Sequence, residues 1–272
     1  MNDRARHQSG HLMLITPDRV FYAGLLGRPR QRCPGAFHVY VSIEGGLWLT
    51  TGTGRESFGE LAVVAPNVRH TIASEHRAAI CLVIEPKSVR AGAFEQLAER
   101  LSGAERASFA QRIRGAYAEL RQRQHSDDMT NAEFDTMCFG EALPARSLDP
   151  RVVRSIAQIG RFCGDPVTAA SCAAEAGLSS SRFLHLFKQE TGISFRAFRA
   201  WKRARHLLHF ANQDLNLAHL AQDIGYPDST HFSHSIRRFY GLKPRAIFSG
   251  SRDLAIYRSE AGLLNASRQG RA

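Results

Sequence analysis

From residue 11 to residue 86 the hydrophobic positions fall in short runs that are rich in β-branched and aromatic residues. The runs occupy residues 37–43, 47–51, 61–64 and 79–84. Gly, Pro and Asn separate the runs, and these residues favour tight turns. Short strands at such close spacing are typical of a small barrel or a sandwich. We expect a small β-barrel here.

The hydrophobic period changes to that of helices over residues 88–123. Apolar residues three and four positions apart predict two amphipathic helices, one around Leu97 and Leu101 and one around Ile113 and Leu120. Their apolar faces can either form a subunit interface or pack on the chain's own barrel. Residues 124–150 read as a partly helical connector.

An internal repeat lies in the last 120 residues. Phe183, Phe187, Gly192 and Phe198 recur 49 residues later as Phe232, Ile236, Gly241 and Ile247. Upstream, Gly177 matches Gly225 at a separation of 48, so one residue has been added in the second turn. Apolar residues four apart, followed by a glycine, describe an inward helix face and a left-handed helix end.

Each copy of the repeat follows a short alanine-rich helix that ends at a glycine. Helix, glycine turn and capped helix are the pattern of a helix-turn-helix unit, which predicts units at 168–190 and 217–240. A generic helical hairpin shares this spacing. The core positions are Gly177, Phe183, Phe187, Gly225, Phe232 and Ile236.

The segment between the two units, residues 194–212, contains neither Pro nor Gly. We therefore expect one helix of about 28 Å at 1.5 Å per residue. A rod of that length could hold two recognition helices about one DNA turn apart, ~34 Å, on the same face of a duplex.

Charge is distributed unevenly between the two halves. The net charge is +11 for the 272 residues, of which residues 1–148 contribute +2 and residues 149–272 contribute +9. A near-neutral half joined to a basic half indicates that the second half binds a polyanion. A merely soluble basic surface is the alternative.

The outward positions of the second helix in each unit are the candidates for DNA contact. Residues near the start of such a helix contact base edges, and flanking basic residues hold phosphates. For base contacts we predict Ser181, His185, Thr230 and His234. For phosphate contacts we predict Arg182, Lys188, Arg237 and Arg238.

Several function classes are disfavoured by simple features. No run of 18 apolar residues is present, and residues 1–10 lack the apolar core of a signal peptide, so we expect a cytoplasmic chain without a membrane span. The five cysteines show no CxxC pair and read as reduced, structural thiols.

The two repeats resemble the helix-turn-helix units of the AraC/XylS-type transcriptional regulators. The stretch from Ala173 to Gly192 resembles the first unit, and Gly225 to Pro244 resembles the second, so that the resemblance covers about residues 149–249. Ile236, His234 and Lys243 depart from the residues usual in the family. The departure at His234 leaves the base contact of the second unit uncertain.

The resemblance has implications for the first half and for partners. It implies double-stranded DNA and RNA polymerase as partners, and a cupin-like barrel that senses a small molecule or mediates dimerisation. The expected effector pocket comprises His38, Tyr40, Trp48 and His70. Tyr40 stands where a cupin would have a metal-ligating histidine, so we expect neither a metal nor another cofactor.

The predicted fold is therefore α+β with two domains. A cupin-like barrel (1–86) and a helical dimerisation or connector region (87–148) precede an all-α DNA-binding domain (149–249) and a tail (250–272). The predicted function is a sequence-specific transcriptional regulator that inserts two recognition helices into successive major-groove segments, with control by an effector left open. The alternatives are a cupin-type metalloenzyme with a basic tail and a non-specific nucleic-acid-binding or scaffold protein.

Overall fold

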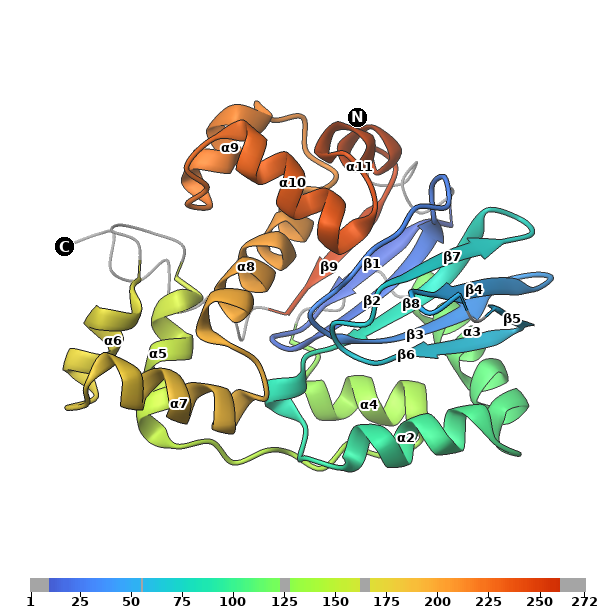
Figure 1. The fold of residues 1–272 in the computed structure, drawn as a ribbon. Helices are drawn as coiled ribbons and strands as arrows, with labels where there is room; N and C mark the ends of the chain where they lie inside the picture. Colours follow the sequence, from blue (N-terminus) through green and yellow to red (C-terminus); the bar gives the residue numbers. More distant parts are fainter. Residues whose placement is uncertain (1–9, 55, 123–127, 162–166, 260–272) are drawn as a thin grey trace.

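A computed structural model describes residues 10–54, 56–122, 128–161 and 167–259 (Figure 1). The predictions made for residues 1–9, for the connector at 124–127, for Cys163 and for the tail beyond residue 259 lie outside these ranges.

The strands of the first half, together with one strand from near the end of the chain, form two β-sheets. The larger has the strand order β6-β3-β8-β2-β1-β9 and the smaller the order β5-β4-β7. The strands are β1 (Leu12–Ile15), β2 (Arg19–Leu25), β3 (Phe37–Ser42), β4 (Leu47–Thr51), β5 (Glu56–Gly59), β6 (Leu61–Val64), β7 (His70–Ser74), β8 (Ala78–Ile84) and β9 (Ala255–Arg258).

The two sheets do not close into the barrel that the sequence predicted. No ladder joins them among the described residues, and they instead pack face to face. Leu49 and Ile72 of the smaller sheet share an apolar core with Tyr40 and Val64 of the larger. Short alternating strands suit either arrangement, because alternation specifies which face is buried and not whether the sheet edges meet.

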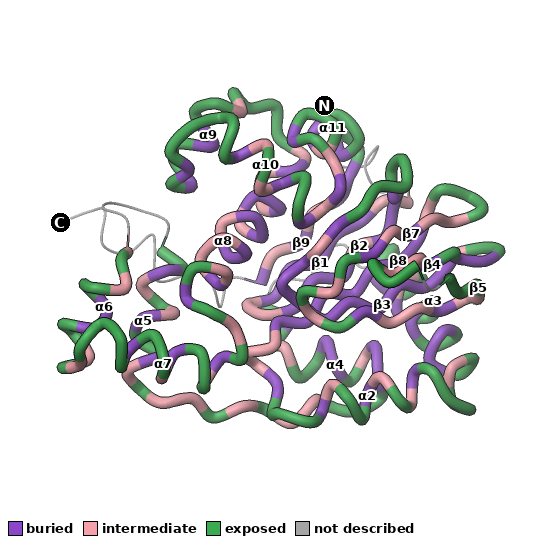
Figure 2. The backbone as a smooth tube through the Cα atoms, in the orientation of Figure 1, coloured by how far each residue is buried: buried purple, intermediate pink, exposed green. Residues whose placement is uncertain are grey.

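The other face of the larger sheet is covered by three helices. These are α2 (Ala93–Ser102), α3 (Arg106–Gln122) and α4 (Asn131–Phe139), preceded by the 3₁₀ turn η1 (Pro86–Ser88). Leu97, Ile113 and Phe134 are buried in one core with Phe21 and Val39 of the sheet. Of the two interpretations of the amphipathic helices, packing on the chain's own sheet is therefore the one observed (Figure 2).

The second half is helical. Its elements are α5 (Pro150–Ile159), α6 (Ala169–Glu175), α7 (Ser180–Thr191), α8 (Phe195–His206), η2 (Leu207–Phe210), α9 (Leu217–Asp223), α10 (Ser229–Tyr240) and α11 (Pro244–Gly250). The α+β class with a sheet-rich first half and a helical second half is as predicted. No helix in the described part of the chain is long and apolar enough to cross a bilayer.

Two segments of the second half attach to the larger sheet, one of them against expectation. The predicted tail contains β9, which pairs in parallel with β1 so that Leu12 lies opposite Ala255. The linker is shorter than predicted, since its α-helical part ends at His206 and a 3₁₀ turn follows. A 3₁₀ turn is common at the end of a helix. Leu207 and Leu208 of this turn are buried in the core that also contains residues of both sheets.

Candidate nucleic-acid interface and adjoining cavity

The two helix pairs predicted from the repeat have matching geometry. The bounds of α7 and α10 differ by 49 residues at both ends, and those of α6 and α9 differ by 48. The additional residue therefore lies in the turn of the second pair, as the sequence predicted.

Each turn depends on a glycine and a capping side chain. Gly177 and Gly225 have φ angles of 66° and 84°, in the left-handed region that glycine adopts without a Cβ clash. Ser179 and Asp228 each accept a hydrogen bond from the backbone N–H three residues later. These bonds satisfy otherwise unpaired amides at the start of α7 and α10 and fix where each recognition helix begins.

The inward faces of α7 and α10 are buried, but in different cores. Phe183 and Phe187 pack against Phe195 of the linker, with ring centroids 5.6 and 5.2 Å away, in a core confined to the helical half. Phe232 and Ile236 lie in the core that also contains the inner face of the sheets. The first unit thus has a core of its own, whereas the core of the second unit is shared with the first half of the chain (Figure 1).

The outward faces present every residue that the sequence assigned to DNA. All eight side chains are exposed: Ser181, Arg182, His185, Lys188, Thr230, His234, Arg237 and Arg238. The first four lie on α7 and the last four on α10. Exposure makes these side chains available to a duplex and does not by itself establish which of them contact it.

The linker helix α8 ties both units to the sheet. Arg203 lies over the ring of Tyr226, 5.7 Å from its centroid, which joins the linker to the turn of the second unit. Lys202 and Arg205 are buried beside Glu85, each within 3.1 Å of its carboxylate. Arg205 also donates hydrogen bonds to two backbone carbonyls at the β1–β2 turn, at 2.7 and 3.0 Å.

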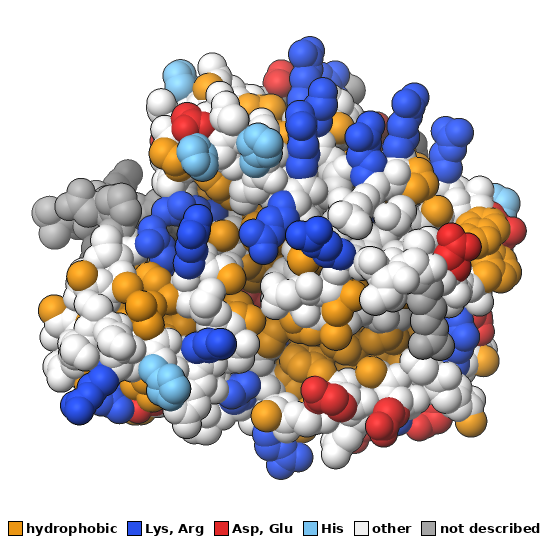
Figure 3. Space-filling model, in the orientation of Figure 1, with side chains coloured by type: hydrophobic (Ala, Val, Ile, Leu, Met, Phe, Trp, Pro, Cys, Tyr) orange, Lys and Arg blue, Asp and Glu red, His pale blue; other side chains and the backbone are white. Residues whose placement is uncertain are grey.

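Basic side chains gather over the helical half and the adjoining strand ends. Figure 3 shows Lys and Arg across the upper part of this face, whereas the acidic side chains concentrate at the lower right. The separation agrees with the +9 net charge of residues 149–272. Such a surface attracts a polyanion over distances of about a Debye length, ~8 Å at physiological salt.

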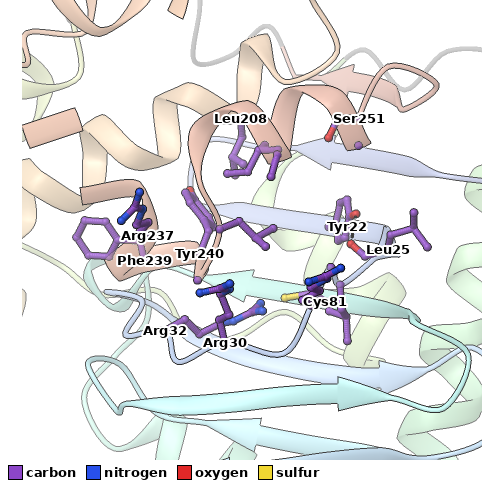
Figure 4. Close-up of a pocket in the computed structure, with 18 of the residues that line it drawn as sticks. Tyr22, Leu25, Arg30, Arg32, Cys81, Leu208, Arg237, Phe239, Tyr240 and Ser251 are labelled. Atoms are coloured by element: carbon purple, nitrogen blue, oxygen red, sulfur yellow. Dashed lines mark hydrogen bonds between the residues drawn. The ribbon is translucent and has the colours of Figure 1, made fainter. Parts of the chain in front are cut away.

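A cavity of about 770 Å³ lies between the larger sheet and the second unit. Its walls come from β1, β2, β3 and β8, from the loop at residues 26–32, and from η2, α10 and α11 (Figure 4). The apolar part of the lining comprises Met13, Val20, Leu25, Leu26, Val83, Leu208, Phe239, Leu242, Ala246 and Ile247. The size falls within the range of small-molecule sites.

The loop at residues 26–33 closes the cavity against the second unit. The backbone N–H of Cys33 donates to the carbonyl of Arg238 at 2.7 Å. Gly27 lies so close to Leu242 that a Cβ at residue 27 would stand 2.9 Å from its Cδ2 atom. This loop is not among the site residues expected from the sequence, although its alternating arginines at 28, 30 and 32 form a visible charge pattern.

The predicted effector residues are only partly brought together. His38 and Tyr40 line the cavity, and His70 hydrogen-bonds to Tyr40 at 2.9 Å without belonging to the cavity wall. Trp48 is 44% exposed and packs on Phe58 of the smaller sheet, away from the cavity. The sequence could not separate these cases, because it places all four residues in the same strand-rich region without showing which face of a sheet each occupies.

Burial keeps the two histidines neutral. It lowers the pKa of His38 to about 3 and that of His70 to about 4. The Nδ1–H of each ring donates a hydrogen bond to a backbone carbonyl, that of His38 to Ala36 and that of His70 to Val68, both at 3.0 Å. No group of three His, Cys, Asp or Glu side chains gathers in the described part of the chain.

The free cysteines of the described segments are Cys33, Cys81, Cys138 and Cys172. The last three are buried, and burial raises the pKa of the Cys81 thiol to about 12. Such thiols are unreactive and pack as small apolar groups.

Comparisons with known proteins agree with this geometry. A family model described as a helix-turn-helix domain matches residues 172–249. The HTH-type transcriptional activator RhaS of Escherichia fergusonii is 28% identical over 153 residues, which are 52% of this chain and 54% of RhaS. The match thus spans about half the length of this curated relative.

Two crystal structures of ToxT from Vibrio cholerae resemble the whole arrangement. The structure from strain O395 has a TM-score of 0.52 at 9% identity and covers 85% of this chain and 98% of ToxT. The unsaturated fatty acid-bound structure from strain SCE256 has a TM-score of 0.51 at 10% identity and covers 85% and 95%. At these identities the likeness concerns the fold alone.

Proposed function

We propose that this chain is an AraC/XylS-type transcriptional regulator, which binds double-stranded DNA through both helix-turn-helix units and thereby regulates transcription. The observation that carries the proposal is the pair of equally capped recognition helices, offset by 49 residues, with exposed basic faces. Regulators of this family are not enzymes, so the metalloenzyme considered from the sequence is set aside.

Each recognition helix enters a segment of the major groove. Ser181 and His185 contact base edges from α7, and Thr230 and His234 do so from α10. Arg182 and Lys188 on α7 hold phosphates. Arg237 and Arg238 hold phosphates beside α10. All of these side chains are exposed. In helix-turn-helix proteins, residues near the N-terminus of the second helix contact base edges in the major groove.

The linker sets the distance between the two segments of the operator. α8 contributes about 18 Å at 1.5 Å per residue, and η2 adds about 8 Å at 2.0 Å per residue. The resulting rod supports recognition helices on one face of a duplex at successive turns. The operator of one chain is accordingly bipartite and not palindromic.

A small-molecule effector controls this activity. One ToxT structure holds an unsaturated fatty acid, and the present chain has a cavity of about 770 Å³ between its two halves. RNA polymerase as a partner follows from the family alone. A homodimer would use a surface other than the apolar faces of α2 and α3, because these already cover the sheet.

Selection of genomic fragments by the full chain, followed by titration of a labelled fragment, tests the DNA-binding proposal. We expect His234→Ala to weaken binding to a selected fragment about 10-fold, the equivalent of about 1.4 kcal/mol, and to change binding to unrelated DNA little. His76→Ala is the matched control, since His76 is exposed on the β7–β8 turn, which has no assigned DNA contact.

Two results would contradict the proposal. One is the absence of any enriched fragment together with no affinity for duplex DNA at low salt. The other is binding with a steep salt dependence but equal affinity for all sequences, which would favour the non-specific nucleic-acid-binding alternative.

A further inference from the structure

The charged side chains that line the cavity between the sheet and the second unit are all positive. Five cationic side chains line it, and no Asp or Glu does: Arg28, Arg30, Arg32, Arg237 and Lys243. They come from two segments about 200 residues apart in the sequence. Cations crowded in this way repel one another unless an anion lies among them.

Arg32 is the most unusual of these cations. Arg32 is only 9% exposed, and the Nε and Nη2 atoms of its side chain have no hydrogen-bond partner. Its backbone is held in place by two hydrogen bonds with His70, at 2.8 and 2.9 Å. Buried N–H groups that have no partner are costly, and a planar carboxylate is the group that satisfies two guanidinium N–H donors at once.

The remainder of the cavity is apolar. Leu25 of β2 and Ile247 of α11 belong to its wall, and Figure 4 places Leu25 and Tyr22 on the side opposite to Arg30, Arg32 and Arg237 in this view. An occupant that satisfies both ends has one anionic group and an apolar body. A polar sugar or a free phosphate would leave the apolar wall without contacts.

We propose that this cavity binds an amphipathic organic carboxylate, that Arg32 holds the carboxylate, and that the bound ligand withdraws Arg237 from DNA. The coupling rests on the proposed function, in which Arg237 holds a phosphate beside α10. Arg237 lines the cavity and also stands on the exposed face of the recognition helix. One guanidinium cannot pair with a ligand carboxylate and a DNA phosphate at the same time.

The occupied cavity also restrains the second unit. Its walls include Tyr240 and Leu242 from the end of the unit and Tyr22 from the sheet, so a ligand that contacts both sides fastens α10 to the sheet. Thermodynamic linkage then requires that DNA weaken ligand binding by the same factor by which the ligand weakens DNA binding.

Calorimetry on the full chain tests the ligand class. The probes are dodecanoate, naphthalene-2-carboxylate and the uncharged 1-dodecanol, each below its aggregation limit. We expect a carboxylate to bind at least 10-fold more tightly than 1-dodecanol. The two carboxylates distinguish an aliphatic from an aromatic apolar body.

Variants of the cationic residues test the contacts. Arg32→Met should weaken carboxylate binding at least 10-fold and leave ligand-free DNA binding unchanged. Arg30→Gln, at an exposed position of the same loop, should also weaken carboxylate binding. This variant replaces Arg32→Met in the test if a thermal melt shows that Arg32→Met does not fold.

The shared residue is tested by a matched pair. Arg237→Gln should weaken both DNA and carboxylate binding, whereas Arg238→Gln, the neighbouring arginine outside the cavity wall, should weaken DNA binding alone. A saturating carboxylate should lower the affinity of the unmodified chain for a selected DNA fragment about 10-fold, and saturating DNA should lower carboxylate affinity equally.

Several results would overturn the inference. These are equal binding of 1-dodecanol and the carboxylates, carboxylate binding unaffected by both Arg32→Met and Arg30→Gln, or carboxylate binding without any change in DNA affinity. Carboxylate binding by a chain that binds no DNA would instead contradict the proposed function and uphold the ligand class. DNA binding without carboxylate binding would contradict the inference and uphold the proposed function.

Discussion

Glu85 is the residue through which the linker helix meets the sheet. It is 1% exposed, and both of its oxygens accept hydrogen bonds from Lys202 at 3.1 Å. Arg205 stands 3.1 Å from the same carboxylate, so one buried anion neutralises part of the charge of two buried cations. Burial lowers the pKa of Lys202, since desolvation disfavours its charged form. Asp18 adds a second negative charge near both cations, and Glu85 is the carboxylate that stands 3.1 Å from each of them.

Removal of that charge should be strongly destabilising. We expect Glu85→Gln to lower the free energy of unfolding by about 3 kcal/mol, because two buried cations then lose the carboxylate that pairs with them directly. Urea denaturation followed by circular dichroism measures the change. Glu95→Gln, at an exposed position of α2, should stay within about 0.5 kcal/mol of the unmodified chain. Equal effects of the two changes would show that the buried cluster contributes little.

The helix-turn-helix units illustrate how local chemistry positions an element. Each recognition helix starts at a capping oxygen and ends at a glycine in the left-handed region, Gly192 with φ 78° and Gly241 with φ 71°. The turn before it depends on a second such glycine. All of these signals lie within a few residues of the element that they define. The sequence could therefore predict both units and the additional residue in the second turn.

A comparison of two glycine substitutions tests the role of the turn. Gly177→Ala should lower the stability of the first unit by about 1 kcal/mol, because its φ of 66° is strained for alanine although no atom lies within 4 Å of the new Cβ. Gly115→Ala, in the interior of α3 and equally unobstructed, should raise stability by about 0.5 kcal/mol. Thermal unfolding measures both. A stabilising effect at both positions would refute the argument from backbone conformation.

At the scale of the whole molecule, the two units differ in what supports them. The core of the first unit lies within residues 152–198 and includes no strand. The core of the second unit continues into the inner face of both sheets, and β9 adds a strand beyond it. The chain is thus one fold in which half of the DNA-binding region depends on the sheet-rich half for its packing. A ligand between the two can act on the second unit without touching the first.

This asymmetry predicts unequal protection in a fragment. In a fragment of residues 149–272, we expect the amides of α7 to keep their protection from hydrogen exchange and those of α10 to exchange at least 10-fold faster than in the full chain. The reason is that the fragment lacks the sheet against which Phe232 and Ile236 pack. Mass spectrometry of the exchanged peptides measures the difference. Equal protection of both helices would mean that the second unit is stable without the sheet.

The sequence by itself determined the helix-turn-helix repeat, its capping residues and its exposed basic faces. Helix periodicity, caps and left-handed glycines act over a few residues, so the printed chain contains the whole signal. For the first half it determined that strands are present and, in Leu97 and Ile113, which face of each helix is buried.

Only the tertiary structure decided what each buried face packs against. Hydrophobic alternation specifies an inner face but not its partner, so it could not predict two facing sheets in place of a barrel, nor the pairing of β9 with β1. The cavity arises in the same way, because Arg32 and Arg237 meet only after segments some 200 residues apart have packed together. The chemistry of its lining therefore depends on both segments together and cannot be read from either one alone.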